Sequence, residues 1–433
     1  MELKEIKNIK GLTVMDSYGL IVAGGGLTGV AAAVAAARRG IRVLLLERAN
    51  CLGGAAANNL VFPFMPYRTS VDGKIVDLSA GFFKELTGSL EKAGAIGESI
   101  CDFDTEYLKL VLNRKVLKEN ISLLFGAFVK DCIKEGDRIT AVQVQTKSGE
   151  MTFYADIFID ATGDADLSAI AGIPFELGRE EDGLCQPMTL CFRVGNVDAA
   201  LYNAEEQNRI NRAYREYKAA GKIKNPRNDV LIFKTPVSGI LHFNTTRVIK
   251  RNPLDAWDIT AAEIEAREQV FELMDFLKAV SSAFKNSVLL ETAPQIGVRE
   301  SRRIVGKHIL TAEELKDCTV FEDSIAAGNY DIDIHDPSGG GTKHYFFPAG
   351  KYYTIPYRSL LPASGAENLL TAGRCISATH EAQASIRIMP ICCCLGEAAG
   401  EAAALALETG VTPEEISLAE LQSRLRANGA KIF

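Results

Sequence analysis

The chain has 433 residues, of which 47% are hydrophobic and 24% are charged, and its formal net charge is −7. This length is more than one compact core usually holds, so we expect two or three domains. Charges of both signs are interspersed and no block of Lys or Arg forms a stripe, which excludes nucleic acid and anionic lipid surfaces as expected partners.

Residues 18–47 read as a short strand, a glycine turn, an alanine-rich helix and a second strand. Gly24, Gly26 and Gly29 match G-x-G-x-x-G, in which the glycines permit a tight turn, the approach of a pyrophosphate and close packing of helix on strand. Glu47 ends the second strand, at the spacing after Gly29 where a carboxylate can accept hydrogen bonds from the ribose of an adenosine. The stretch therefore predicts a dinucleotide-binding unit, with the phosphates at the N-terminus of the helix.

The same stretch has two other interpretations. Residues 17–37 carry no charge and are long enough for a membrane span, but each of the central glycines would cost a helix about 1 kcal/mol. Glu2 and Glu5 precede the apolar run, which does not fit a signal peptide. We therefore expect no membrane span, and we expect residues 1–16 to form an arm before the first strand.

Two further glycine turns follow. Gly53 and Gly54 come soon after Glu47 and let the chain pass close to a pyrophosphate or a ring, and a later buried strand ends at Ala161-Thr162-Gly163. Between these turns the sequence predicts two helices and a small β-meander, at residues 79–93, 104–116 and 121–154. The Ala-Thr-Gly turn can bring backbone to a bound dinucleotide a second time.

The middle of the chain, from about residue 166 to residue 360, shifts toward polar and aromatic residues and predicts a separate domain. Its clearest helix, residues 260–279, opens with a capping box of Thr260 and Glu263. Residues 337–342 are the most flexible stretch of the sequence and fit either a lid or a plain loop.

Arg299 and Arg302 follow an apolar segment of this middle domain. They could clamp a substrate carboxylate or sulfate through paired hydrogen bonds, or they could pair with a carboxylate such as Glu300. His335 lies beside Asp336, but this spacing matches no known kind of metal site, so we expect no metal.

From residue 361 the chain returns to the features of the first domain. A buried strand ends at Gly373 and Arg374, and a helix of small residues begins near Pro390, which suits a first turn. Such a helix can pack its backbone closely against a neighbour. The ten cysteines include no C-x-x-C pair and indicate reduced thiols in a cytoplasmic protein, and those at 392–394 fit buried apolar filler.

Together these elements predict an α/β fold. We expect a Rossmann-like domain made from residues 1–165 and 361–433, with a parallel sheet and a β-meander, and an inserted α+β substrate or cap domain at residues 166–360. NAD would need only the first glycine turn. A ligand that also touches the C-terminal strand and helix, at the other end of the chain, suits an elongated FAD.

The sequence resembles the FAD-dependent oxidoreductases of the glutathione-reductase-like fold, in the branch related to fumarate reductase and succinate dehydrogenase flavoproteins. It is most similar to the bacterial group called simply FAD-dependent oxidoreductase. The resemblance runs through VAGGGLTGVAAAVAAARRG, IDATGDADL, IGVRESRRIVG, IPYRSLLP and LLTAGRCISATHEAQASIRIMPICCCLGEAAGEAAA. It implies that Glu47 holds the adenosine ribose, that the turn at 24–29 holds the pyrophosphate, and that Gly373 and Arg374 lie on the ribityl-phosphate side.

The chain also departs from related patterns. Disulfide reductases of this fold have a Cys-x4-Cys pair after the second strand, whereas Cys51 has no such partner here, so a dithiol relay is not expected. Fumarate reductases show H-x-x-N-R-x-G before the last helix, whereas this chain has His380 and Arg387 at a different spacing.

The expected site combines these residues. A helix that begins near Met389 would direct its positive N-terminus at the flavin and make hydride acceptance easier. His380 and Arg387, the polar residues nearest to it in sequence, are the expected catalytic residues on one wall, with Arg299 or Arg302 on the other; His380 would act as acid or base, although a lone His is often structural. The expected FAD-binding residues are Gly24, Gly25, Gly26, Leu27, Thr28, Gly29, Glu47, Arg48, Gly53, Gly54, Ala55, Ala56, Val129, Ala161, Thr162, Gly163, Gly373, Arg374, Ile388 and Met389.

The leading hypothesis is a flavoenzyme that moves a hydride between a non-covalent FAD and a small, anionic organic substrate. Non-covalent binding is expected because no His, Cys or Tyr occurs at residues 55–59, after the double glycine. A flavin monooxygenase or oxidase, and a flavoprotein subunit that passes electrons within a larger complex, remain as alternatives. Besides the small-molecule substrate, the sequence leaves open a redox partner protein and a homo-oligomer.

Overall fold

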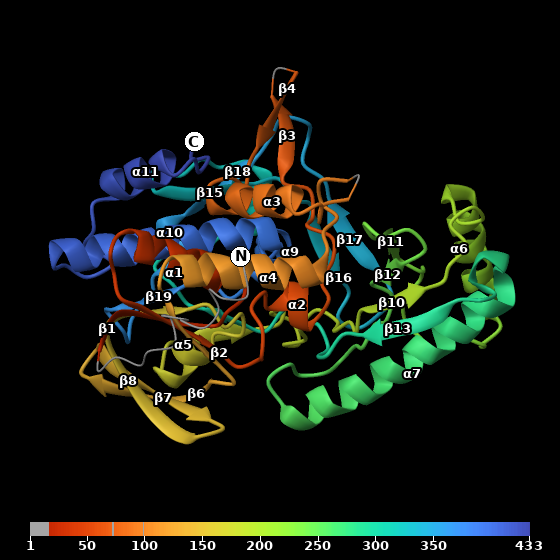
Figure 1. Ribbon diagram of the computed structural model, residues 1–433, viewed down its shortest axis with the longest axis horizontal. Helices are drawn as coiled ribbons and strands as arrows, with labels where there is room; N and C mark the ends of the chain where they lie inside the picture. The colour runs from red at the N-terminus through yellow and green to blue at the C-terminus, as the bar shows by residue number, and fades with distance from the viewer. Residues whose placement is uncertain (1–16, 72, 98) are drawn as a thin grey trace, which may run out of the picture.

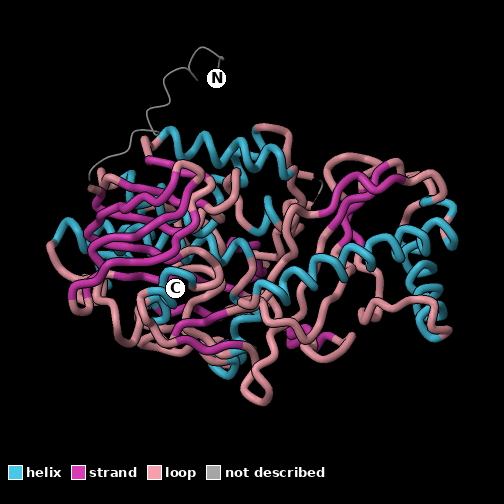
Figure 2. The backbone as a smooth tube through the Cα atoms, turned by 90° about the horizontal axis from the view of Figure 1, so that it is seen from below, coloured by secondary structure: helices cyan, strands magenta, loops and turns pink. Residues whose placement is uncertain are grey.

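A computed structural model describes residues 17–433, except residues 72 and 98. The arm predicted at residues 1–16 lies outside the described residues. Figure 1 shows the elements along the chain, and Figure 2 shows the large sheet at one end of the molecule and a smaller sheet at the other, with short strands between them.

The larger sheet is built around β1 (Tyr18–Ala23), in the order β5-β2-β1-β8-β7-β6, with β19 also paired to β8. Its parallel part contains β2 (Val43–Glu47), β5 (Ser122–Phe125), β19 (Leu369–Thr371) and the second half of β8 (Gly149–Asp160). β1 and β2 are almost entirely buried, as expected of strands covered on both faces. All of these strands except β5 end beside the glycine turns noted above.

The β-meander consists of β6 (Phe128–Glu135), β7 (Arg138–Thr146) and the first half of β8. β8 pairs antiparallel with β7 up to Tyr154 and parallel with β1 from Ala155 onward. One long strand therefore joins the meander to the parallel sheet. The predicted α/β class, with its parallel sheet and meander, is confirmed.

Helices α1 (Leu27–Arg38) and α10 (Met389–Thr409) lie against each other although they come from opposite ends of the chain (Figure 1). A Cβ on Gly396 would overlap the carbonyl of Thr28, and one on Gly400 would overlap that of Ala32. This contact confirms the close packing predicted for the C-terminal helix. Among the described residues α10 is the one helix long and apolar enough to cross a membrane, and 94% of its most apolar window is buried in the structure.

Helices α3 (Phe82–Lys92) and α4 (Thr105–Lys118) complete this part, close to the predicted ranges. Asp104 caps α4 by accepting hydrogen bonds from the backbone N–H groups of Glu106 and Tyr107. The smaller elements are α2 (Ala55–Asn58), β3 (Arg68–Val71), β4 (Lys74–Asp77), α5 (Asp166–Ile170), α8 (Ala312–Lys316), α9 (His380–Ile386), α11 (Leu418–Ala427) and short 3-10 helices at Ser282–Phe284 and Tyr357–Leu360.

The middle unit has an antiparallel sheet of its own, in the order β11-β12-β10-β13, flanked by two helices. These elements are β10 (Phe192–Gly195), α6 (Ala204–Ala219), β11 (Ile232–Lys234), β12 (Leu241–Phe243), α7 (Ala256–Val280) and β13 (Val288–Thr292). The helix predicted at 260–279 is α7, but its cap is Asp255, which accepts from the N–H groups of Trp257 and Asp258. Thr260 instead donates to the carbonyl of Ala256, so the predicted capping box is wrong.

The buried hydrophobic residues that form the core of the middle unit lie between residues 188 and 296, together with Leu60. Residues 310–361, expected in the same domain, contribute Leu310, Ile325 and Tyr353 to the core that holds α1 and α10. The predicted boundary at residue 360 therefore differs from the division of the cores. The segment between contains β14 (Arg302–Ile304), which pairs with β9 (Phe175–Leu177), β15 (Ser324–Gly328), which pairs with β18 (Tyr353–Pro356), and the hairpin of β16 (Ile332–His335) and β17 (Thr342–Tyr345).

Candidate functional site

The turn between β1 and α1 has the geometry of a phosphate cradle. Gly24 has a φ of +103°, and a Cβ there would overlap the carbonyl of Ala161. A Cβ on Gly29 would overlap the carbonyl of Gly24, so helix and strand could not approach. Gly26 caps α1 without a side-chain hydrogen bond, which leaves the N–H groups of Leu27 and Thr28 free for an anion.

The double glycine lies directly beside this turn. Gly53 forms a bridge with Gly26, and its N–H donates to the carbonyl of Gly25 at 2.9 Å. A Cβ on Gly54 would lie 2.8 Å from the Cα of Gly26. The structure therefore brings residues 53–56 and 24–26 together at one edge of the sheet.

Glu47 is 6% exposed and holds the glycine turn from the adjacent strand. Its carboxylate accepts hydrogen bonds from the N–H groups of Gly25 at 2.6 Å and Ala49 at 2.7 Å. A small pocket beside it is lined by the predicted residues Gly24, Arg48, Val129 and Thr162, and also by Phe128 and Asp166, which sequence analysis did not identify.

The Ala161–Gly163 turn and the Gly373–Arg374 turn meet farther along the same edge. Arg374 pairs with Asp164 at 2.6 Å, and Ser301 donates to the same carboxylate at 2.7 Å. Burial opposes this charge, but Arg374 and the bond from Ser301 hold the pKa of Asp164 below its usual value. Asp164 and Ser301 were not predicted. The IDATGDADL motif placed Asp164 beside a predicted turn, whereas no local pattern singles out Ser301.

The predicted residue His380 is the first residue of α9 and is 5% exposed. Its Nδ1 lies 2.8 Å from the carboxylate of Glu300, which also accepts from the N–H of Gln186 at 3.0 Å and from Arg303. Its Nε2 is buried and has no hydrogen-bond partner among the described residues. The imidazole ring of His380 is therefore held at Nδ1 by Glu300, and its Nε2 is free. Sequence analysis considered Glu300 only as a partner for an arginine.

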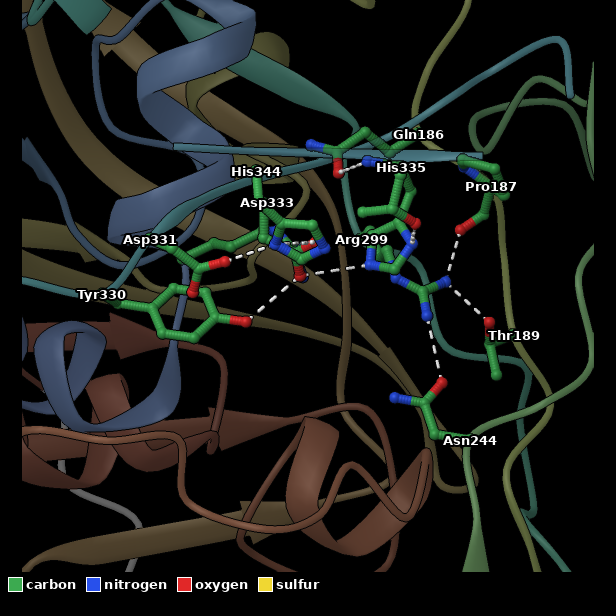
Figure 3. Close-up of polar contacts among 12 residues, drawn as sticks. Gln186, Pro187, Thr189, Asn244, Arg299, Tyr330, Asp331, Asp333, His335 and His344 are labelled. Atoms are coloured by element: carbon green, nitrogen blue, oxygen red, sulfur yellow. Dashed lines mark hydrogen bonds and ion pairs between the residues drawn. The ribbon is translucent and has the colours of Figure 1, made fainter. Parts of the chain in front are cut away.

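Arg299 and Arg387 were predicted on facing walls of one site, and the positive charge of Arg387 acts on Arg299. Arg299 donates only to neutral oxygens, at 2.7 Å to Pro187, 2.6 Å to Thr189 and 3.0 Å to Asn244 (Figure 3). Burial, and then the positive charge of Arg387, lowers the pKa of Arg299 to about 9.

Arg387 follows α9 directly. One of its nitrogens lies 3.8 Å from the Asp333 carboxylate, and its Nε is buried without a partner in the described part of the chain.

Arg302 does not join this group. Its guanidinium donates to the carbonyl of Asp164 and pairs with Asp166 at 2.9 Å, and it lies over the ring of Phe175. Arg302 lies in β14 and is directed toward α5. Of the two candidates, only Arg299 is therefore on the same side as Arg387.

The hairpin of β16 and β17 supplies residues that sequence analysis missed. Asp333 accepts from Tyr330 at 3.1 Å and lies 3.2 Å from Nε2 of His335 (Figure 3). The oxygens of Asp331 and Asp333 and a nitrogen of His344 lie within 4.8 Å of one another, close enough for a metal ion. The positive charges of Arg299 and Arg387 act on Asp333, however, and oppose a cation there. Alternation in a two-stranded hairpin is a weak signal, which is why the sequence did not reveal this group.

The thiols at 392–394 are all buried in α10. Burial raises the pKa of Cys392 and of Cys394 to about 12. They therefore carry no nucleophilic thiolate at neutral pH, in line with the filler role predicted for them.

Comparisons with known proteins identify the family of the chain. A family model described as FAD dependent oxidoreductase matches residues 19–425. Similar solved structures include p-nitrophenol 4-monooxygenase PnpA from Pseudomonas putida, with 11% identity, a TM-score of 0.47, and coverage of 95% of this chain and 88% of that one. A geranylgeranyl bacteriochlorophyll reductase-like protein from Thermoplasma acidophilum has 12% identity, a TM-score of 0.44, and coverage of 96% and 83%. At these values the structural likeness carries no inference about reaction or substrate.

Proposed function

Because the chain belongs to the FAD dependent oxidoreductase family, we propose that it moves a hydride between non-covalently bound FAD and a small, anionic organic substrate. Bound FAD supplies the redox chemistry, taking up or giving up two electrons with a proton. The protein supplies binding, orientation and electrostatics.

The described residues fit FAD. The uncapped first turn of α1 and Glu47 suit the pyrophosphate and the adenosine, and the paired turns at Gly163 and Arg374 suit the middle of the molecule. α10 begins at Met389 after Ile388, which makes no side-chain cap, so its N-terminal N–H groups are available to an electronegative ring edge. The absence of His, Cys and Tyr at residues 55–59 supports non-covalent binding.

One observation supports an anionic substrate: the positive charge of Arg387 acts on Arg299, and neither charge is fully balanced. Arg299 donates only to neutral oxygens, and Nε of Arg387 has no partner among residues that the structure describes. Buried cations without a counter-charge are costly, and a substrate oxyanion between them would gain charge-assisted hydrogen bonds.

His380 is the proposed proton donor or acceptor. Glu300 fixes its Nδ1, and its buried Nε2 is free to exchange a proton with a substrate held by the arginines. The ion pair between Glu300 and Arg303 keeps the carboxylate in place.

The proposal is tested by anaerobic reduction of the FAD-loaded protein, followed by mixing with candidate organic anions or with oxygen. We expect at least one organic anion to reoxidise the flavin faster than buffer alone, as followed by the return of flavin absorbance. Rapid reoxidation by oxygen, with no response to any organic anion, would instead support a monooxygenase or oxidase.

Three finer points also belong to the proposal. The relation to fumarate reductase flavoproteins is supported by the recurrence of a His and an Arg, His380 and Arg387, before the last helix. A cytoplasmic location is supported by the ten cysteines, all of which are free thiols. The partner that we propose is the small-molecule substrate.

A further inference from the structure

One side of α7 carries large apolar side chains that the described part of the chain leaves open to solvent. Trp257 is 82% exposed, Ile264 61% and Phe271 56%. These residues are seven apart in sequence, which puts them in a row along one side of a helix. Figure 1 shows α7 on the outer side of the middle unit, and no other described element lies beyond it in that view. An exposed apolar row of this kind is typical of a surface that binds another macromolecule.

The opposite side of α7 holds the helix in the fold. Ala262, Val270, Leu273 and Leu277 are buried there in the core of the middle unit. The exposed row therefore contributes nothing to this core and is available for an interaction.

Exposed charges alternate with the apolar row. Glu268, Asp275 and Lys278 form no ion pair or side-chain hydrogen bond with other described residues. Arg267 lies 3.7 Å from Glu263 of its own helix, but 46% of its side chain is exposed. With about 3.6 residues per turn, positions 267, 268, 275 and 278 fall on the same side of the helix as the apolar row.

This side of α7 is complementary to itself when a second copy of the helix runs antiparallel to it. If a two-fold axis passes between Arg267 and Glu268, each of these residues faces the other one in the second copy. The same register places Ile264 of one copy opposite Phe271 of the other. Apolar side chains thus meet apolar side chains, and opposite charges meet at the centre.

The charges favour this register over its neighbours. Trp257 lies opposite Lys278 of the second copy, where a cation–π contact can form. Asp275 lies opposite Thr260, so no charge on this side of the helix meets a charge of the same sign. A register in which Ile264 faces itself would instead place both central charges opposite neutral residues.

The charge balance of α7 argues against a membrane as the partner. Helices that lie on a membrane carry Lys and Arg on their polar side, whereas α7 contains six acidic and two basic residues. A contact between two copies about a two-fold axis requires only a surface that complements itself, and α7 provides one.

We propose that the protein forms a homodimer in which the exposed side of α7 packs antiparallel on the same side of α7 in a second copy. The residues in contact are Trp257, Ile264, Arg267, Glu268, Phe271 and Lys278. One pair of helices covers less than the roughly 800 Å² per partner of a standard interface, so the dissociation constant should be on the order of 10 μM. None of the candidate FAD-binding or catalytic residues lies on this surface.

The first test is sedimentation velocity of the FAD-loaded protein at concentrations from about 1 to 100 μM, which span this constant. Trp257 is the only tryptophan of the chain, so its fluorescence reports directly on the surface. We expect a change from monomer to dimer, with emission that moves to shorter wavelength as Trp257 leaves water. A monomer at every concentration, with unchanged emission, would overturn the proposal.

The second test exchanges the two central charges. Arg267→Glu and Glu268→Arg should each raise the dissociation constant ~10-fold or more, because each puts like charges opposite one another at two symmetric positions. The double variant restores opposite charges and should return the constant to within ~3-fold of the unaltered protein. Single variants that dimerise as the unaltered protein does would contradict the register.

Ile264→Glu places a charge at the centre of the apolar row and should abolish the dimer. Val237→Glu is the matched control, because Val237 is also exposed, at 49%, but lies in the turn between β11 and β12. It should keep the dimer. A dimer that survives Ile264→Glu would show that another surface is used. An emission shift with phosphatidylcholine–phosphatidylglycerol vesicles, but none with protein concentration, would assign the row to a lipid surface and overturn the proposal.

Discussion

At the scale of single residues, buried carboxylates hold the glycine turns in place. Glu47 was predicted to hold a ribose, and in the structure it also ties the glycine turn to the second strand through the N–H of Gly25. Asp160 likewise anchors the Ala161–Gly163 turn by accepting from Thr162 and Ser168. These two carboxylates therefore fix the shape of the turns.

Glu47→Ala should weaken FAD binding by roughly 1.5–3 kcal/mol, which is typical for hydrogen bonds to a charged acceptor. Loss of the anchor at Gly25 acts in the same direction. The dissociation constant can be measured from the quenching of flavin fluorescence on binding. An unchanged constant would mean that the ribose is held by another group.

At the scale of elements, α10 organises its surroundings through more than its N-terminus. Its glycines admit the backbone of α1, and its buried Glu397 accepts from the N–H of Phe82 at 2.9 Å, which caps the start of α3 from another helix. Gly81, the residue at that cap, has no side chain with which to do so. The cap therefore depends on contact between segments that are far apart in the sequence.

Glu397 should make the stability of the fold depend on pH. Burial raises its pKa to about 7, although the bond from Phe82 opposes this shift. The folded state then binds the proton more tightly than the unfolded chain, so the free energy of unfolding falls as pH rises from about 4.5 to 7. The glutamine in Glu397→Gln cannot ionise. Relative to the unaltered protein, the free energy of unfolding of this variant should therefore increase by ~1–3 kcal/mol between pH 5 and pH 8, as measured by denaturant unfolding.

Glu408→Gln is the control on the same helix. Glu408 pairs with Arg424, mainly through hydrogen bonding that lowers its pKa, so its contribution is lost as pH falls. Because this carboxyl is largely ionised in both the folded and the unfolded state above about pH 5, the difference between Glu408→Gln and the unaltered protein should stay nearly constant between pH 5 and pH 8. A Glu397→Gln difference that does not change with pH would show that this carboxyl is not protonated in the folded state.

At the scale of the whole molecule, the sequence predicted the parts whose signals are local. The glycine turns, Glu47 and the buried strands follow from spacing and periodicity, and so did the α/β class with its meander. The domain boundary at residue 360 stays a prediction, but Leu310 and Tyr353 belong to the hydrophobic core that holds α1 and α10, which composition alone does not reveal.

Only part of the site was predicted, because only some of its residues have a local signal in the sequence. Arg299, Arg387 and His380 stand beside recognisable segments, whereas Asp333 lies in the β16–β17 hairpin and approaches Arg387 only in the folded protein. Arg302 resembled Arg299 in sequence, yet its place in β14 directs it to Asp166.

We propose above all that Arg299 and Arg387 hold a substrate oxyanion beside FAD. The most direct test of this claim is to measure FAD content and turnover, with the organic anion found by anaerobic mixing, in Arg299→Gln, Arg387→Gln and the Arg302→Gln control. We predict that the first two variants keep FAD and lose turnover by a factor of about 10² or more, the scale of one preorganised donor, while Arg302→Gln keeps most of its turnover. Loss of FAD or of folding in the first two, with turnover per bound FAD unchanged, would contradict the claim and make both arginines structural.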